Sequence, residues 1–173
     1  MKSVEQALEI ILAQVQHNPK ERIPLLEALG RVLAEEIYSD IDLPPFTNSA
    51  VDGFAVRATD IEKASTDTPV MLKVIGEVTA GEYPTQSLLP QTAMRVMTGA
   101  PLPIGADAMV MVEDTRMQSG ERVEILLESR VGSHIRYQGE ELRQGSPVLP
   151  PQSPLHAPEI GMLATVGCGL VPV

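Results

Sequence analysis

The sequence has a single cysteine, Cys168, no tryptophan and very few other aromatic residues. One cysteine cannot form an internal disulfide, and it excludes the paired-cysteine motifs of structural zinc sites and dithiol redox sites. A reducing, cytoplasmic location is therefore expected. Because aromatic residues make up only 3% of the chain, stacking platforms for single-stranded bases are also scarce.

Positively charged residues are also few compared with acidic ones. Lys plus Arg number 13 against 23 Asp plus Glu, which gives a formal net charge of −10 over 173 residues. This balance opposes binding to the phosphate backbone of nucleic acids. No apolar run approaches the length that spans a bilayer, and the amino-terminal residues lack the apolar core of a signal peptide. We expect a soluble protein with neither nucleic acid nor a membrane as partner.

The amino-terminal part predicts two helices that pack together. Ser3 and Gln6 have the spacing of a capping box, apolar residues follow at helical spacing to Val15, and Asn18-Pro19 supplies the stop. Pro24 suits the first turn of a second helix, which the three-and-four spacing of leucines extends to Ile37.

The pattern changes at Pro44-Pro45, where two backbone amide donors are lost and helix is disfavoured. Five short apolar or alternating runs follow, and each has the length of a strand: Phe54 to Val56, Val70 to Val78, Met94 to Met97, Met109 to Val112 and Val123 to Leu127. Glycines lie between the runs, as turns with unusual backbone angles require: Gly81, Gly99, Gly105, Gly120 and Gly132. These features predict a compact all-β unit.

A third helix is expected over 157–166, with Pro158 in its first turn and Gly167 at its end. If it returns to the first two helices, the helical domain is discontinuous. The predicted fold class is therefore α+β, in which a small helical domain (1–45 plus 143–173) carries an inserted, barrel-like all-β domain (46–142).

Three loop segments remain as candidates for chemistry after the common motifs of phosphate loops, dinucleotide folds, esterases and metalloproteases are excluded. They are Asn48-Ser49-Ala50-Val51-Asp52-Gly53, Met97-Thr98-Gly99-Ala100-Pro101 and Arg136-Tyr137-Gln138-Gly139-Glu140-Glu141. On spacing alone, ordinary turn chemistry is the favoured explanation of the first segment. A plain β-turn explains the second equally well, and a solvated charged loop explains the third. A threonine hydroxyl with turn amides could also hold an anion at the second segment.

Taken in this order and at these distances, the three segments resemble those of the molybdopterin molybdenumtransferase family, the MoeA and gephyrin E-domain family. The first extends through Phe54-Ala55-Val56 and is preceded by Leu43 to Thr47, and the second extends back to Met94. The similarity covers essentially the whole chain. It implies an enzyme of molybdenum cofactor biosynthesis that takes molybdate and adenylylated molybdopterin, inserts the metal into the dithiolene and releases AMP, assisted by Mg²⁺.

The resemblance also implies roles for individual residues. Asp52 matches a functionally important aspartate and is the best candidate for a catalytic residue and metal ligand. Glu141 stands where the family commonly has aspartate, and is the second catalytic candidate. The remaining candidates are substrate-binding residues: Asn48, Ser49, Thr98, Gly99, Arg136, Gly139 and Glu140.

Family members also carry a pterin-binding domain and a small β domain, neither of which is expected within this sequence. They form homodimers in which the β insertion faces the pterin-binding domain of the other subunit. The first hypothesis is therefore the amino-terminal portion of the transferase, inactive without the pterin-binding domain. The alternatives are a stand-alone dimerisation or interaction module, and an acidic hydrolase that uses its loop carboxylates.

Overall fold

The structure is a computed structural model that describes residues 3–15, 18–119 and 121–173. It divides into two compact units, one formed by Met1–Asp40 with Ser146–Val173 and the other by Ile41–Gly145. The chain is mostly β, with two α-helices among the described residues. No helix in this part of the chain combines the length and the apolar character needed to cross a membrane.

The first unit contains both α-helices and two small antiparallel sheets. Its elements are α1 (Val4–Leu12), β1 (Arg22–Pro24), η1 (Leu25–Glu27), β2 (Ile37–Tyr38), β11 (Pro147–Leu149), α2 (Ala157–Thr165) and β12 (Leu170–Pro172). Strand β1 pairs with β12, and β2 pairs with β11. Its core is made by Ala28, Leu33, Leu155, Leu163 and Val171. Leu163 is the buried residue of α2, so this helix packs on the segment that contains Ala28 and Leu33.

The helix predicted from Pro24 to Ile37 is wrong. Only the 3-10 turn η1 forms there, and the backbone instead bonds to the carboxyl-terminal segment of the chain. Leu25 N donates to Gly169 O at 3.1 Å, Gly30 N to Leu155 O at 2.8 Å, and Leu33 N to Ser153 O at 2.9 Å. Gly30 has φ +79°, which ends any helix at that point. Tertiary pairing has replaced the local helical preference.

The two terminal helices match their predicted start signals. Ser3 and Gln6 form the capping box at the start of α1, and a proline lies in the first turn of α2. The expected packing of α1 on a second helix is wrong, because that helix is absent and no residue of α1 is buried among the described residues. The unit is formed from two separate stretches of the chain, but it is not mainly helical, since four of its seven elements are strands.

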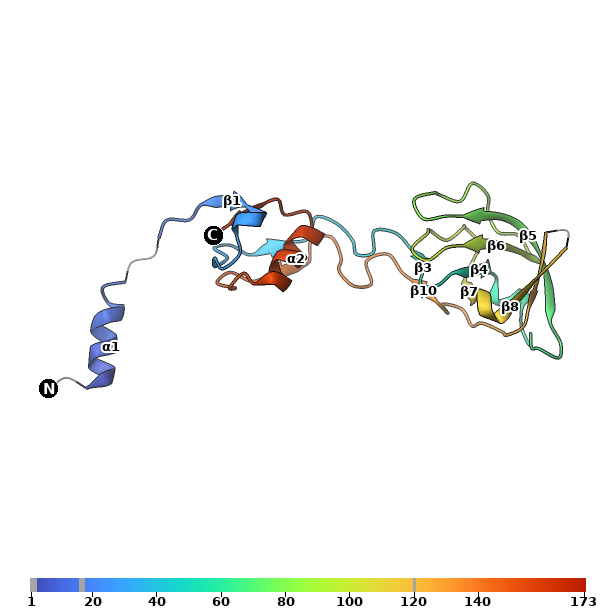
Figure 1. The fold of residues 1–173 in the computed structure, drawn as a ribbon, viewed down its shortest axis with the longest axis horizontal. Coiled ribbons are helices and arrows are strands. Elements are labelled where there is room, and N and C mark those ends of the chain that lie inside the picture. The colour runs from blue at the N-terminus through green and yellow to red at the C-terminus, as the bar shows by residue number, and fades with distance from the viewer. Residues whose placement is uncertain (1–2, 16–17, 120) are drawn as a thin grey trace. The chain divides into compact units, whose positions relative to one another are not determined.

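The second unit is built on a six-stranded sheet with the strand order β7-β4-β6-β5-β9-β8, which curls into a half-barrel (Figure 1). Its strands are β4 (Gly53–Val56), β5 (Val70–Val78), β6 (Thr92–Val96), β7 (Ala108–Met111), β8 (Thr115–Gln118) and β9 (Arg122–Ile125). The unit also contains η2 (Ala58–Asp60), η3 (Val112–Asp114) and the pair formed by β3 (Asn48–Ser49) and β10 (Ile135–Arg136). All five predicted strands are confirmed within two residues at each end. Strand β8 was not predicted.

Alternation along the strands gives the sheet two apolar faces. Phe54, Val56, Leu72, Val110, Val123 and Ile125 belong to one cluster, whereas Ala55, Val78, Met94, Val96 and Met109 belong to the other. Four of the predicted turn glycines have positive φ, namely Gly81, Gly99, Gly105 and Gly132, and Gly120 lies outside the described residues. Because β5 and β6 run parallel and β4 runs against them, the end of β6 lies next to the start of β4.

Candidate functional site

The first and second sequence segments meet through the side chain of Asp52. Oδ1 of Asp52 accepts hydrogen bonds from both the backbone N–H and the hydroxyl of Thr98, each at 2.7 Å. Asp52 stands directly before β4 and Thr98 two residues after β6, so the antiparallel pairing of these strands brings the two residues together. Both residues are exposed. The Oδ2 atom of Asp52 makes no hydrogen bond within the described part of the chain.

The turn that carries Asp52 is fixed from both sides. Before it, the buried Ser49 donates its hydroxyl to Val51 O at 2.5 Å and accepts from Val51 N at 3.2 Å. After it, Gly53 lies so close to β7 that a β-carbon would stand 2.0 Å from Val110 O. Only glycine allows this approach of two backbones. The pairing of β4 with β7 therefore depends on Gly53, and it sets the direction in which Asp52 leaves the sheet.

The first segment lies between the other two. Ser49 N donates to Ala100 O at 3.1 Å, and Gly99 N donates to Ser49 O at 2.8 Å. On the other side β3 pairs with β10 (Figure 1). The register of this pair places Asn48 opposite Arg136. The three segments, up to about 90 residues apart in the sequence, are therefore neighbours in the β unit.

The third segment is held by residues that sequence reasoning missed. Asp42 accepts from Gln138 Nε2 at 2.8 Å through Oδ2 and from Gln144 N at 2.9 Å through Oδ1. Gly139 is buried at φ +68°, where a β-carbon would lie 3.3 Å from Asp42 Oδ1. Asp42 stands beside the Pro44-Pro45 turn and outside all three segments, so no motif singled it out.

The two adjacent glutamates of this segment have different surroundings. Glu140 Oε2 accepts the backbone N–H of Tyr137 at 2.8 Å, so its carboxylate closes the turn. The Glu141 carboxylate makes no hydrogen bond or ion pair to the described residues, and its backbone N–H donates to Leu43 O at 2.9 Å. No hydrogen bond or ion pair joins Glu141 to Asp52 or Thr98 in this part of the structure. Asp52 and Thr98 are the pair that the fold assembles.

Three of the predicted site residues are buried, namely Asn48, Ser49 and Gly139. The Ser49 hydroxyl is engaged with Val51, as described above. The Asn48 side chain donates to Phe46 O at 3.1 Å, while its Oδ1 is buried with no partner in the described structure. The exposed predicted residues are Asp52, Thr98, Gly99, Arg136, Glu140 and Glu141.

The pKa of Asp52 is lowered from its ordinary value. The largest cause is the hydrogen bond from the Thr98 hydroxyl, followed by the bond from the Thr98 backbone, and the positive charge of Arg95 adds a smaller effect. The carboxyl group is therefore ionised throughout the physiological pH range. Arg95 lies on β6 within the extended second segment, but sequence reasoning gave it no role.

The described residues contain no cluster of three or more His, Cys, Asp and Glu side chains that could hold a metal ion. Asp52 Oδ2 is nevertheless a suitable single ligand for Mg²⁺, which proteins commonly bind through one or two carboxylates together with water and substrate phosphates. A single carboxylate of this kind can supply one ligand of a cation, and the described residues do not form a cage around it.

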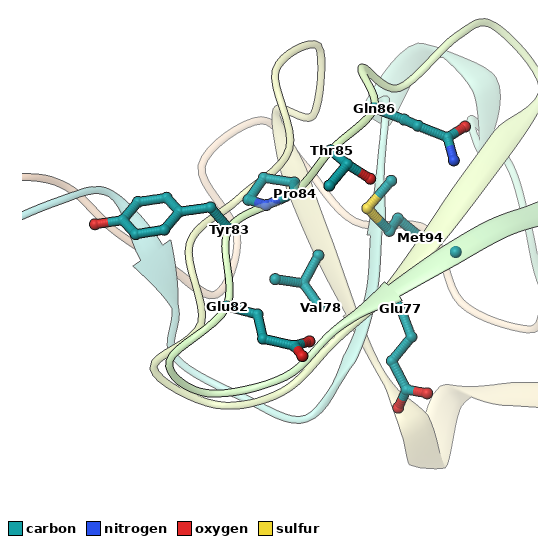
Figure 2. A pocket seen from close by; sticks show the side chains of 9 residues that line it. Glu77, Val78, Glu82, Tyr83, Pro84, Thr85, Gln86 and Met94 are labelled. Carbon is teal, nitrogen blue, oxygen red and sulfur yellow. The ribbon is translucent and has the colours of Figure 1, made fainter.

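A shallow cavity of about 370 Å³ lies at the end of β5 and beside the loop that follows it. Its lining includes Val78, Glu82, Thr85 and Met94, and none of the predicted site residues. Figure 2 shows Glu77 and Tyr83 extending away from Met94 and Thr85. The cavity therefore faces the side of the sheet to which Met94 and Val78 belong.

Comparison with known proteins gives consistent matches. The sequence profile of the MoeA N-terminal region (domains I and II) matches residues 2–167. The chain is 44% identical to the molybdopterin molybdenumtransferase of Synechococcus elongatus, over 99% of the chain and 43% of that protein. It is 37% identical to molybdopterin molybdenumtransferase 2 of Mycobacterium tuberculosis, over 100% of the chain and 42% of that protein.

The fold is similar to the crystal structure of the molybdopterin biosynthesis moeA protein of Pyrococcus horikoshii, with a TM-score of 0.91 and 36% identity. That match covers 98% of the chain and 45% of the Pyrococcus protein. The chain thus spans less than half the length of the relatives it matches. None of these matches favours a stand-alone interaction module or a loop-carboxylate hydrolase.

Proposed function

We propose that this chain, which belongs to the family of MoeA N-terminal regions, supplies the part of the active site of a molybdopterin molybdenumtransferase that contains Asp52 and Thr98. The proposed reaction inserts molybdenum from molybdate into adenylylated molybdopterin, with release of AMP. The observation that supports it is the geometry of the Asp52 carboxylate. Thr98 orients this group through two hydrogen bonds to Oδ1, so Oδ2 is available to bind a ligand.

The lowered pKa of Asp52 distinguishes between two roles for this carboxylate. A general base works best when its pKa lies near the working pH, and the bonds from Thr98 move the pKa of Asp52 further from neutrality. A permanently ionised carboxylate suits the binding of a cation or of a hydrogen-bond donor on the substrate. We assign Asp52 to ligand binding and orientation, and not to proton transfer.

Mg²⁺ fits this role as the cation between Asp52 and a substrate phosphate. When bound, it would neutralise charge that develops on the departing nucleotide. Asp52 would be its protein ligand on this chain. Thr98 keeps the carboxylate in one orientation through its two hydrogen bonds to Oδ1.

The third segment lies next to the first segment, on the side away from the second, and it also contributes residues to the proposed site. Arg136 is exposed across from Asn48, and Glu141 has a carboxylate without partners among the described residues, so both are available to substrate. We propose that the site is completed by the pterin-binding domain, in a homodimer located in the cytoplasm. The inserted barrel-like domain and the discontinuous unit around it would then be the amino-terminal portion of the working enzyme.

Molybdenum insertion by a chimera tests this proposal. The chain replaces the matching part of the Synechococcus elongatus relative, and insertion is measured with adenylylated molybdopterin, molybdate and Mg²⁺. We expect turnover by the chimera and none by residues 1–173 alone, because these residues match only the amino-terminal region of the relatives. Turnover by the chain alone would contradict the division of the site between the two parts.

The Asp52→Asn chimera tests the carboxylate itself. The change keeps the shape of the side chain and its hydrogen-bonding capacity but removes the negative charge that would bind the cation, so turnover should fall by at least ~100-fold with an unchanged fold. Asp67→Asn is the matched control, since Asp67 is exposed in a turn of the same unit. If turnover survives in Asp52→Asn, or if it falls only together with thermal stability, Asp52 has a turn-forming role alone.

A further inference from the structure

A row of three residues crosses the sheet beside Asp52. In the strand register Arg95 of β6 lies opposite Phe54 of β4 on one side and opposite Glu77 of β5 on the other. Residues directly opposite each other in a sheet point to the same face. The side chains of Arg95 and Glu77 therefore share one face of the sheet. Asp52 stands directly before β4, the neighbouring strand of β6.

The lining of the cavity at the end of β5 includes Glu77, Val78 and Met94. Figure 2 shows Glu77 pointing away from Met94, the residue that precedes Arg95 on β6. Met94 and Val78 belong to the apolar cluster opposite that of Phe54. The direction of Glu77 away from Met94 agrees with the strand register, which places Glu77 opposite Arg95.

Arg95 is only loosely held. Its Nε lies 3.6 Å from Glu77 Oε1, with both side chains about half exposed. The two terminal amino groups of the guanidinium make no hydrogen bond to the described residues. An exposed ion pair of this kind contributes little to stability. A ligand could therefore engage Arg95 without the loss of a strong contact.

The guanidinium also lies within electrostatic reach of the Asp52 carboxylate. After the two hydrogen bonds from Thr98, its charge is a further cause of the lowered pKa of Asp52. The site thus holds a carboxylate with a free oxygen beside a cation with free donors. A guanidinium presents paired N–H groups that match a phosphate-like oxyanion in two-pronged geometry.

We propose that Arg95 is an oxyanion-binding residue of this site, and that Glu77 is the counter-ion that holds it in place until the anion binds. The ligand is a tetrahedral oxyanion, either molybdate or a nucleotide phosphate. This inference rests on the proposed function, because a chain with net charge −10 needs a local cation to accept anionic substrates.

Binding of two anions to the wild-type chain tests the inference without any turnover. Sodium molybdate and inorganic phosphate are titrated separately, and the Nε–H signals of the arginines are followed by NMR. We expect the Arg95 signal to move with at least one anion. The anion with the tighter binding identifies the source of the oxyanion.

Three variants give the decisive comparison. Arg95→Gln should weaken binding by at least about tenfold, and Arg95→Lys should weaken it less, because a lysine keeps the charge but loses the paired donors. Glu77→Gln removes the competing carboxylate, so the anion should bind as tightly as in the wild type or more tightly. Backbone amide spectra show whether each variant keeps its fold.

Arg116→Gln is the matched control. Arg116 lies on β8 of the same sheet, opposite Glu124 of β9, with an ion pair of 3.4 Å. The Arg116→Gln variant loses the same charge from the same kind of ion pair, and this change should leave anion binding unchanged.

Two results would overturn the inference. One is equal binding by Arg95→Gln and Arg116→Gln. The other is no movement of the Arg95 signal at about 20 mM of either anion, well above a millimolar Kd. Neither result bears on turnover by the chimera or on its loss in Asp52→Asn, so a failure here is distinct from a failure of the proposed function.

Discussion

At the scale of single residues, one oxygen of Asp52 accepts both hydrogen bonds from Thr98. The side-chain bond is the larger cause of the lowered pKa. Thr98→Val removes that bond and keeps the backbone bond, so the pKa of Asp52 should rise toward its ordinary value. Carbon-13 NMR titration of the carboxyl group measures it. Thr79→Val, an exposed change near the end of β5, is the control and should leave this pKa in place.

The same bonds determine how stability depends on pH. Because the folded-state pKa of Asp52 lies below its unfolded value, the contribution is present above the unfolded pKa, about 3.9, and is lost as pH falls through the folded pKa. The difference in unfolding free energy between wild type and Thr98→Val should therefore be constant near neutrality and shrink in acid. Urea unfolding at several pH values measures this. A difference that grew in acid would contradict the hydrogen-bonded pair.

Gly53 controls where Asp52 is placed. Any β-carbon there would meet Val110 O at 2.0 Å, and the two paired strands cannot separate without breaking the sheet. We expect Gly53→Ala to destabilise the β unit by more than about 3 kcal/mol in urea unfolding.

Gly76→Ala on β5 is the matched control for Gly53→Ala. Its β-carbon would meet only Met94 Cε at 3.9 Å, an ordinary contact. It should change stability by less than about 1 kcal/mol. If both alanine variants were equally stable, the close approach of β4 and β7 at Gly53 would be disproved.

Much of the site could be predicted from the sequence, because turn residues at strand ends mark it. Thr98 follows one apolar run, and Asp52 with Gly53 precedes another. Because the two strands pair antiparallel, these residues lie at the same end of the strand pair. What could not be predicted is which polar side chains are buried in structural hydrogen bonds and which remain exposed. The hydroxyl of Ser49 is buried and bonds to Val51, although Ser49 is as polar as the exposed Thr98. Asp42 lies far from the third segment in sequence, so its contact with Gln138 had no local signal.

At the scale of elements, the segment after Pro24 shows the limit of periodicity. Its leucines have helical spacing, yet Leu26 is 88% exposed and Leu29 is 63% exposed, while Leu33 is 1% exposed. Strands were easier to predict, because the core strands of the β unit have continuous or alternating apolar runs with glycine turns between them. Strand β8 was missed since three of its four residues are exposed and the run contains only one large apolar residue, Met117.

A pair of leucine truncations separates the helix prediction from the observed structure. Leu33→Ala should cost about 2–5 kcal/mol, because the side chain is buried in the core of the first unit. Leu26→Ala should stay within about 0.5 kcal/mol, because the side chain is solvated. Thermal or urea unfolding of the two variants measures the difference. An amphipathic helix would bury both residues on one face, and similar costs would support it.

At the scale of the whole molecule, helix α1 presents an apolar face that the described residues do not cover. Val4 is 81% exposed, Leu8 54%, Ile11 62% and Leu12 59%, and their spacing puts them on one side of the helix. Isolated helices of this length are marginal in water, so most of their stability must come from packing. The face therefore requires a covering surface, which a second copy of the chain or another part of a longer protein would supply.

We expect the chain to form a homodimer at micromolar concentration, with this face as part of the contact. Leu8→Glu introduces a charge at the centre of the face and should shift the mass measured by analytical ultracentrifugation toward the monomer. Ala13→Glu adds the same charge at the C-cap on the opposite side of the helix and should leave the mass unchanged. Circular dichroism of both variants checks that the chain stays folded. A wild-type chain that is monomeric at these concentrations would contradict the homodimer. Should Leu8→Glu instead remain dimeric, the contact lies elsewhere on the chain, and α1 plays no part in it.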